Sequence, residues 1–183
     1  GDADDDITGG GANDTIAGGS GDDTITGGAG ADTLTGGGGA DTFVIRSMDD
    51  LVTLSEIALD IDGNTLRNAD AFDVITDVSS DDILDFRAFD VNATNDTKDD
   101  FALGLNFNQF DFTLVSFNPT DMEVGNQYLL EGNYSQANGE FVVQNDGPDS
   151  LLGIYDGEEI GMVTLAGVSF SSALAENGFD LLV

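Results

Sequence analysis

The chain has 183 residues, of which 36 are acidic and four are basic, and its formal net charge is −32. This charge argues against nucleic acids and anionic membranes as partners, because both would repel it. The chain has no cysteine and no histidine, which excludes disulfides, Ser-His-Asp and Cys-His catalysis, and zinc hydrolysis within these residues. No apolar run approaches the length of a membrane span, so we expect no membrane insertion.

Residues 1–44 contain a nine-residue repeat. Written in nines from Gly9, the segment is GGGANDTIA, GGSGDDTIT, GGAGADTLT and GGGGADTFV, preceded by GDADDDIT, the end of an earlier copy. Glycine predominates at places one, two and four, where it permits the positive φ of a sharp turn. The last three residues alternate polar and apolar as in a short strand. Each copy has an aspartate at place six (Asp5, Asp14, Asp23, Asp32, Asp41) and a large apolar residue at place eight (Ile7, Ile16, Ile25, Leu34, Phe43).

Two copies per coil would stack residues that are eighteen apart in the sequence. Asp5 would lie over Asp23, and the same step joins the other place-six aspartates. Ile7, Ile25 and Phe43 would line one inner face, and Ile16 and Leu34 the other. Each copy is therefore predicted to supply one turn and one short strand.

The spacing of such coils favours calcium as the ion between the turns. Adjacent strands lie about 4.8 Å apart, and two oxygens on opposite sides of a calcium ion, at about 2.4 Å each, span nearly the same distance. Magnesium, at about 2.0–2.1 Å, would have to draw the coils together. We therefore expect repeats that are largely unfolded without calcium, because the acidic chain repels itself, and folded with it.

The repeat resembles the GGxGxDxUx nonapeptide of RTX proteins. The resemblance implies an all-β fold, in which a right-handed, calcium-bound parallel β-roll with two nonapeptides per turn is followed by a β-rich C-terminal capping region. A flexible low-complexity linker is the alternative interpretation of so acidic and glycine-rich a segment.

The same resemblance implies a ligand set for each ion. One turn supplies the place-two and place-four carbonyls and its aspartate, and the turn two copies later supplies the place-one and place-three carbonyls and its aspartate. We expect about three to five calcium ions. The three sites within the repeats would be Gly1, Ala3, Asp5 with Gly18, Ser20, Asp23; Gly10, Ala12, Asp14 with Gly27, Ala29, Asp32; and Gly19, Gly21, Asp23 with Gly36, Gly38, Asp41.

Some positions depart from the repeat or lie beside its ligands. Place four is alanine at Ala3 and Ala12, so those turns are expected to be more strained or to bind more weakly. The aspartates at places three, five and seven are expected to be solvated charges rather than ligands; they are Asp2, Asp4, Asp6 and Asp22.

The segment after the repeats is polar and mixed. Apolar residues from Leu51 to Ile61 recur at helical spacing, which predicts a short helix between Asp49 and Asp60 with Ser55 or Asp50 as its cap. Residues 60–64 have the sequence DIDGN, which resembles part of an EF-hand loop but lacks the distal glutamate. A turn is the favoured interpretation there, and an ion at Asp60 and Asp62 the alternative.

Residues 73–89 have the sequence DVITDVSSDDILDFRAF, which resembles the segment after the last repeat of RTX proteases and epimerases. The resemblance implies that Asp73 is a ligand of the last ion, opposite Asp41. A strand-end aspartate with no metal role is the alternative.

Short β-type runs separated by Asn, Gly, Asp and Pro turns fill the second half of the chain. They predict an antiparallel or mixed sheet that caps the open end of the roll. We expect residues 1–45 to form the roll and residues 46–183 the capping and secretion-signal region. The runs are 101–107, 110–117, 127–130, 140–144, 150–155 and 160–166.

The C-terminal residues carry a further resemblance. Residues 151–168 resemble the ending of RTX C-termini, and the chain stops at FDLLV, residues 179–183. An acidic residue followed by three apolar ones resembles the uncleaved signal that type I exporters recognise. A last β-strand is the alternative.

These features predict a calcium-binding module that folds outside the cell and helps to stabilise and export a longer parent chain. Its partners would be calcium ions, upstream domains of that parent and a type I secretion exporter, and its location would be extracellular. The alternative is an adhesion or surface-layer element that self-associates with calcium. We expect no enzyme activity in these residues, although the parent could be a hydrolase or epimerase with catalysis elsewhere.

Overall fold

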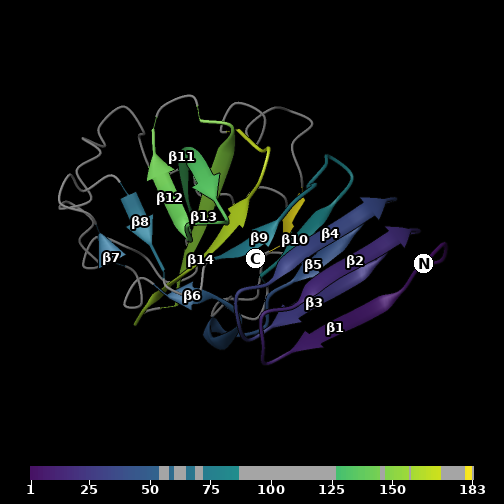
Figure 1. Ribbon diagram of the computed structural model, residues 1–183. Coiled ribbons are helices and arrows are strands. Elements are labelled where there is room, and N and C mark those ends of the chain that lie inside the picture. Colours follow the sequence, from purple (N-terminus) through teal and green to yellow (C-terminus); the bar gives the residue numbers. More distant parts are fainter. Residues whose placement is uncertain are drawn as a thin grey trace.

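A computed structural model describes residues 1–53, 58–59, 65–68, 72–86, 127–144, 147–156, 158–169 and 180–182. Apart from one short 3-10 helix, the regular secondary structure of these residues is all β-strand (Figure 1), which confirms the all-β prediction. The strands are β1 (Asp6–Gly10), β2 (Thr15–Ser20), β3 (Thr24–Gly28), β4 (Thr33–Gly38), β5 (Thr42–Val44), β6 (Val52–Thr53), β7 (Ala58–Leu59), β8 (Thr65–Arg67), β9 (Asp73–Ile75), β10 (Ile83–Asp85), β11 (Gln127–Ser135), β12 (Glu140–Val143), β13 (Asp149–Tyr155), β14 (Ile160–Leu165) and β15 (Asp180–Leu182).

The repeats form a parallel roll with one strand from each nonapeptide. Strands β1, β3 and β5 stack in one sheet, and β2 and β4 stack in the other. Ile7 is in register with Ile25, and Ile25 with Phe43. Ile16 is in register with Leu34. The predicted eighteen-residue stacking and the two inner faces are therefore confirmed.

The turns of the roll depend on glycine at places two and four. Every positive-φ glycine of the repeats lies at one of these places, and φ is 110° at Gly37. A Cβ at Gly37 would also overlap the carbonyl oxygen of Gly19 in the coil before it. The backbone conformation and the close approach of the coils both require glycine there. The six glycines are Gly19, Gly21, Gly28, Gly30, Gly37 and Gly39.

A further coil without glycine closes the roll. Strand β9 pairs with β4, and β10 pairs with β5, so that Ile75 continues the column of Leu34 and Leu84 that of Phe43. The step between these partners is 41 residues instead of 18. Asp73 and Asp82 are nine residues apart and occupy place six. The sequence resemblance predicted a segment after the last repeat and not a further coil.

The insertion between β5 and β9 contains a short 3-10 helix, η1 (Met48–Asp50), followed by β6. The predicted helix is wrong for Leu51 to Thr53, because β6 pairs with β14 through Met162 and Gly161, and for Ala58 and Leu59, because β7 pairs with β8. Nonlocal pairing and burial of Leu51 and Val52 override the helical spacing. Residues 54–57 and 60–64, with the EF-hand-like loop, lie outside the described residues.

The second half of the chain extends one wall of the roll. Strands β11 to β14 form antiparallel pairs, and β14 then pairs in parallel with β9, so the cap and the roll share one sheet. The four predicted strands between residues 127 and 166 are confirmed, whereas residues 101–107 and 110–117 lie outside the described residues. One apolar core accordingly includes Ile25 and Phe43 of the roll together with Leu152 and Val163 of the cap.

Strand β15 lies beside β10 and extends the five-stranded sheet, with Leu181 in register with Leu84. The last β-strand, one of the two interpretations of the C-terminal residues, is therefore present at 180–182. Phe179 and Val183 lie outside the described residues.

Candidate metal centres

The place-six aspartates form two columns that link successive coils, Asp5–Asp23–Asp41 and Asp14–Asp32. The Oδ1 atom of Asp23 accepts a hydrogen bond from the Asp5 N–H at 2.8 Å. Asp32 accepts from Asp14 at 2.8 Å, and Asp41 from Asp23 at 2.9 Å. One oxygen of each later carboxylate is thus fixed by a backbone N–H of the preceding coil. This contact also sets the direction in which the second oxygen points.

The second oxygen of three of these carboxylates has no partner among the described protein atoms. The Oδ2 atoms of Asp23, Asp32 and Asp73 are buried without a hydrogen bond. Asp23 and Asp32 are 1% exposed and Asp73 is 3% exposed. A buried, unpaired carboxylate oxygen is costly unless a cation lies beside it. The structure therefore fits a bound cation at these positions.

Glycine at place one keeps the space around these oxygens free. A Cβ at Gly18 would overlap Asp23 Oδ2 and the carbonyl oxygen of Gly36. Gly27 stands in the same relation to Asp32, and Gly36 to Asp41. A side chain at place one would fill the region into which the unpaired oxygen points.

Each predicted site has its two turns in contact. In the first site, the Gly1 amino group donates to the Gly18 carbonyl, and the Ser20 N–H donates to the Gly1 carbonyl at 2.9 Å. In the second, the Ala29 N–H donates to the Gly10 carbonyl at 2.8 Å. A carbonyl that accepts one N–H retains a second lone pair for an ion.

The third predicted site is assembled in the same way. The Gly21 N–H donates to the Gly38 carbonyl at 2.8 Å, and the Gly37 backbone lies against the Gly19 carbonyl. In each of the three groups expected from the sequence, the two turns therefore lie in contact in adjacent coils, and the assignment of their oxygens as ion ligands stays a prediction.

Burial shifts the proton equilibria of the same carboxylates. It raises the pKa of Asp73 to about 8, against the lowering effect of the Asp32 N–H and together with the repulsion of the Asp32 charge. Burial also raises the pKa of Asp32 and of Asp41 above the ordinary value of 3.8. These groups resist carrying an uncompensated charge, and a divalent cation would supply the compensation.

The expected pairing of Asp73 with Asp41 is wrong. Asp73 Oδ1 accepts the N–H of Asp32 at 2.8 Å, and Asp82 Oδ1 accepts the N–H of Asp41 at 2.8 Å. The cause is the register of β9, which continues the sheet of β4 and so carries Asp73 over Asp32. The next place-six residue, Asp82, then faces Asp41.

In the turn between Asp73 and Asp82, the carboxylates of the turn accept nearby backbone N–H groups. Asp82 Oδ2 accepts the Ser79 N–H at 2.7 Å, so both of its oxygens have partners. Asp77 accepts the N–H groups of Gly36 and Gly37, both at 2.9 Å. Sequence reasoning missed these two residues. The nine-residue spacing of Asp73 and Asp82 and the apolar place-eight residues Ile75 and Leu84 were the available signal.

The ion sites are not clusters of acidic side chains. Among the described residues, no group of three or more His, Cys, Asp or Glu side chains converges to hold a metal. Two aspartates and four carbonyls per site would produce no such cluster. A donor set of oxygens alone suits calcium and not zinc.

Comparison with known proteins identifies the repeats. Residues 1–16 and 8–43 match the RTX calcium-binding nonapeptide repeat, in four copies. This N-terminal segment is therefore an RTX calcium-binding β-roll. No curated protein matches the chain significantly in sequence. No helix of the described residues has the length and apolar character needed to cross a membrane.

Among solved structures, the chain is similar to the solution structure of the AlgE6R2 subunit from the Azotobacter vinelandii mannuronan C5-epimerase. The two share 25% sequence identity over 99% of this chain and 88% of that one, with a TM-score of 0.49.

Proposed function

We propose that the chain is a non-catalytic module that folds when calcium binds between its turns. Ions would lie between Asp5 and Asp23, Asp14 and Asp32, Asp23 and Asp41, and Asp32 and Asp73. The carbonyls of places one to four would complete the first three sites. The observation that supports this assignment is the buried, unpartnered Oδ2 of Asp23, Asp32 and Asp73.

The module would act as a folding switch in secretion. Residues 46–183 would cap the roll and carry the secretion signal, and a type I exporter would pass the chain unfolded where calcium is scarce. Outside the cell, calcium would bind only the folded roll and stabilise it, by about 2.7 kcal/mol per site at a hundredfold excess over Kd. Any catalysis would belong to upstream domains of a longer parent.

A circular-dichroism titration tests the folding switch. Calcium added to the chelated protein is expected to produce the β-sheet signal, and magnesium at the same concentration is not, because its shorter bonds and strict octahedron do not fit the coil spacing. A full signal in chelator, or an equal response to magnesium, would contradict the proposal.

A pair of variants tests the stacking of the sites. Asp23 contributes to two proposed ions and Asp5 to one, so Asp23→Ala is expected to raise the calcium concentration needed for folding more than Asp5→Ala. Equal effects of the two substitutions would count against shared ligands.

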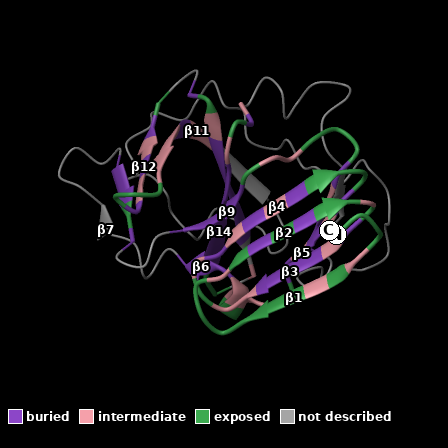
Figure 2. Ribbon diagram, turned by 45° about the vertical axis from the view of Figure 1, so that its right-hand side comes forward, coloured by how far each residue is buried: buried purple, intermediate pink, exposed green. Residues whose placement is uncertain are grey.

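Calcium-driven self-association is the second candidate function. Strands β1 and β2 end their sheets in this segment and are mostly exposed (Figure 2), and this candidate applies where no earlier repeat covers them. Such edges offer unpaired backbone groups to another strand. Light scattering during the titration separates the candidates, because folding without growth in particle size supports the module and growth supports assembly.

A further inference from the structure

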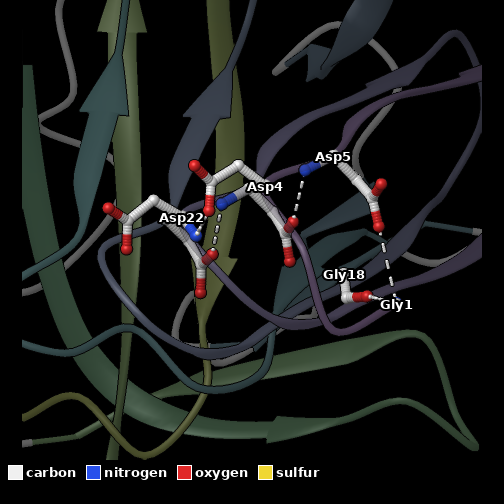
Figure 3. Close-up of polar contacts among 7 residues, drawn as sticks. Gly1, Asp4, Asp5, Gly18 and Asp22 are labelled. Atoms are coloured by element: carbon white, nitrogen blue, oxygen red, sulfur yellow. Dashed lines mark hydrogen bonds and ion pairs between the residues drawn. The ribbon is translucent and has the colours of Figure 1, made fainter.

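The turns of the roll are joined by a second set of hydrogen bonds, at place five. Asp4 Oδ1 accepts the N–H of Asp22 at 2.9 Å (Figure 3). Asn13 accepts the N–H of Ala31 at 3.0 Å, and Asp22 accepts the N–H of Ala40 at 2.8 Å. The same contact thus recurs in three turns, always between residues eighteen apart.

These contacts run in the opposite direction to those of the place-six aspartates. At place five, the side chain of the earlier coil accepts from the N–H of the later one. At place six, the side chain of the later coil accepts from the earlier one. The N–H of Asp22 therefore donates back to Asp4, whereas the next N–H, that of Asp23, donates forward to Asp41. Two consecutive amides fix the backbone at the proposed ligand relative to both neighbouring coils.

The sequence analysis interpreted Asp4 and Asp22 as solvated charges. Both are exposed, so a role in attracting cations by charge is the alternative to a role as acceptors. Asn13 makes the same contact without a charge. The property that the three side chains share is an acceptor oxygen one bond from Cγ, and not a negative charge.

The set of contacts ends where the repeats meet the last coil. Ala31 and Ala40 occupy place five in the last two copies, and their side chains offer no acceptor. The coil that follows is held instead by Asp77 and Asp82, which accept from Gly36, Gly37 and Asp41. The place-five contacts therefore span the three proposed sites within the repeats, and Ala31 provides none at the proposed site of Asp32 and Asp73.

We propose that Asp4, Asn13 and Asp22 are positioning residues for calcium binding. Each holds the next turn at the separation and orientation that its place-six aspartate requires, and none of them contacts the ion. This inference rests on the proposed calcium sites. For the three sites within the repeats it adds a requirement, an acceptor at place five, that the ligands alone do not include.

The test compares Asp22→Ala with Asp22→Asn by calorimetric calcium titration of the whole chain. Asp22→Ala removes the acceptor for the Ala40 N–H and is expected to weaken calcium binding about 3- to 10-fold, the effect of one lost hydrogen bond. Asp22→Asn keeps the acceptor, and its calcium affinity is expected to stay within about twofold of that of the unsubstituted chain. Asp6→Ala removes a charge at the exposed place seven and is the matched control. It is expected to bind calcium as tightly as the unsubstituted chain.

Three results would overturn the inference. Asp22→Asn could weaken calcium binding as much as Asp22→Ala does, Asp6→Ala could weaken it as much, or Asp22→Ala could bind calcium as tightly as the unsubstituted chain. If Asp22→Ala does not fold with calcium, Asp4→Ala repeats the test in the outermost coil. Failure of the proposed function would look different. In that case the unsubstituted chain itself would not bind calcium, or Asp23→Ala would bind calcium as tightly as the unsubstituted chain.

Discussion

The repeats and the last coil share a register but differ in their turns. Both carry an aspartate at place six and an apolar residue at place eight, and their strands stack in the same two sheets. In the repeats, positive-φ glycines form the turns, and the Oδ2 atoms of Asp23 and Asp32 have no partner. In the glycine-free last coil, Asp82 accepts two N–H groups from described residues.

This difference indicates two ways to stabilise a carboxylate inside a turn. A glycine turn leaves space beside the carboxylate and needs a cation. A turn with side chains can direct its own N–H groups at the carboxylate and needs none. The last coil combines the two. On what we call its open side, the Oδ2 atom of Asp73 has no partner among the described residues. On what we call its closed side, both oxygens of Asp82 accept N–H groups. We therefore expect no ion beyond the one proposed between Asp32 and Asp73.

The largest effect is expected where the two regions share their core. Phe43 is fully buried between Ile25 of the repeats and Leu84 of the last coil. Phe43→Ala should destabilise the calcium-bound chain by about 3–5 kcal/mol, the usual cost of such a cavity. Urea denaturation followed by tyrosine fluorescence measures it, because all three tyrosines lie in β11 and β13 of the cap.

Ile7→Ala is the matched control for this substitution. Ile7 occupies the same column in the outermost coil and is only partly buried, so a smaller loss is expected. If the tyrosine transition does not move in Phe43→Ala while the β-sheet signal of the roll does, the roll and the cap unfold independently and the shared core does not couple them.

The next effect separates the open and closed sides of the last coil. Asp73→Asn should remove one bound calcium ion, because the carboxylate beside Asp32 is lost. It should also stabilise the metal-free chain, because Asp73 must take up a proton on folding at neutral pH and Asn need not. Asp82→Asn should keep the number of ions and cost about 1–3 kcal/mol, since its amide group would face the Ser79 N–H as a second donor. Calorimetric stoichiometry and melting in chelator check both variants. Loss of an ion in Asp82→Asn would contradict the distinction.

The pH dependence concerns the same open side. Asp73 in the folded, metal-free chain keeps its proton up to about pH 8, whereas its ordinary pKa is 3.8. Between these values the folded state binds more protons than the unfolded state, so the stability of the metal-free chain should fall as pH rises. Calcium requires the ionised carboxylate, and its affinity should therefore rise with pH, at most about tenfold per unit for each displaced proton, and level off above about pH 8.

Melting in chelator and calcium titration between pH 5 and pH 9 check these trends. The high net charge favours compaction at low pH in the same direction, so Asp73→Asn provides the control. The part of the pH dependence that this substitution removes belongs to Asp73. An unchanged profile in Asp73→Asn would assign the effect to the other carboxylates.

The sequence predicted the roll well because each nonapeptide encodes its own turn and strand. The positive φ of Gly37 and the stacking of Ile25 on Phe43 follow from a period that is visible without any long-range information. The Asp82 turn carries no glycine and follows a long insertion, so the period is broken where it resumes. Its carboxylate contacts depend on the N–H of Ser79, which no spacing of aspartates indicates.

The strand pairing of the insertion could not be predicted from a local sequence pattern either. Leu51 has helical spacing with Leu54 and Ile57, yet the next residue, Val52, pairs with Met162, more than a hundred residues later. Burial against that partner decides the conformation. The same limit applies to Asp73, whose partner is set by the sheet that β9 joins and not by its distance from the last repeat.

The smallest effect is expected at Asp77, on the closed side. Asp77 accepts two N–H groups at the end of β4, and its contacts are partly exposed. Asp77→Asn keeps one acceptor and turns the other into a donor, so it should cost about 0.5–1.5 kcal/mol without changing the number of bound ions. Asp81→Asn removes the same charge from an exposed neighbour and should leave stability unchanged. If the two variants lose the same stability, the closed turn is held by charge and not by the amides of Gly36 and Gly37, and the contrast with the cation-dependent glycine turns would then lose its basis.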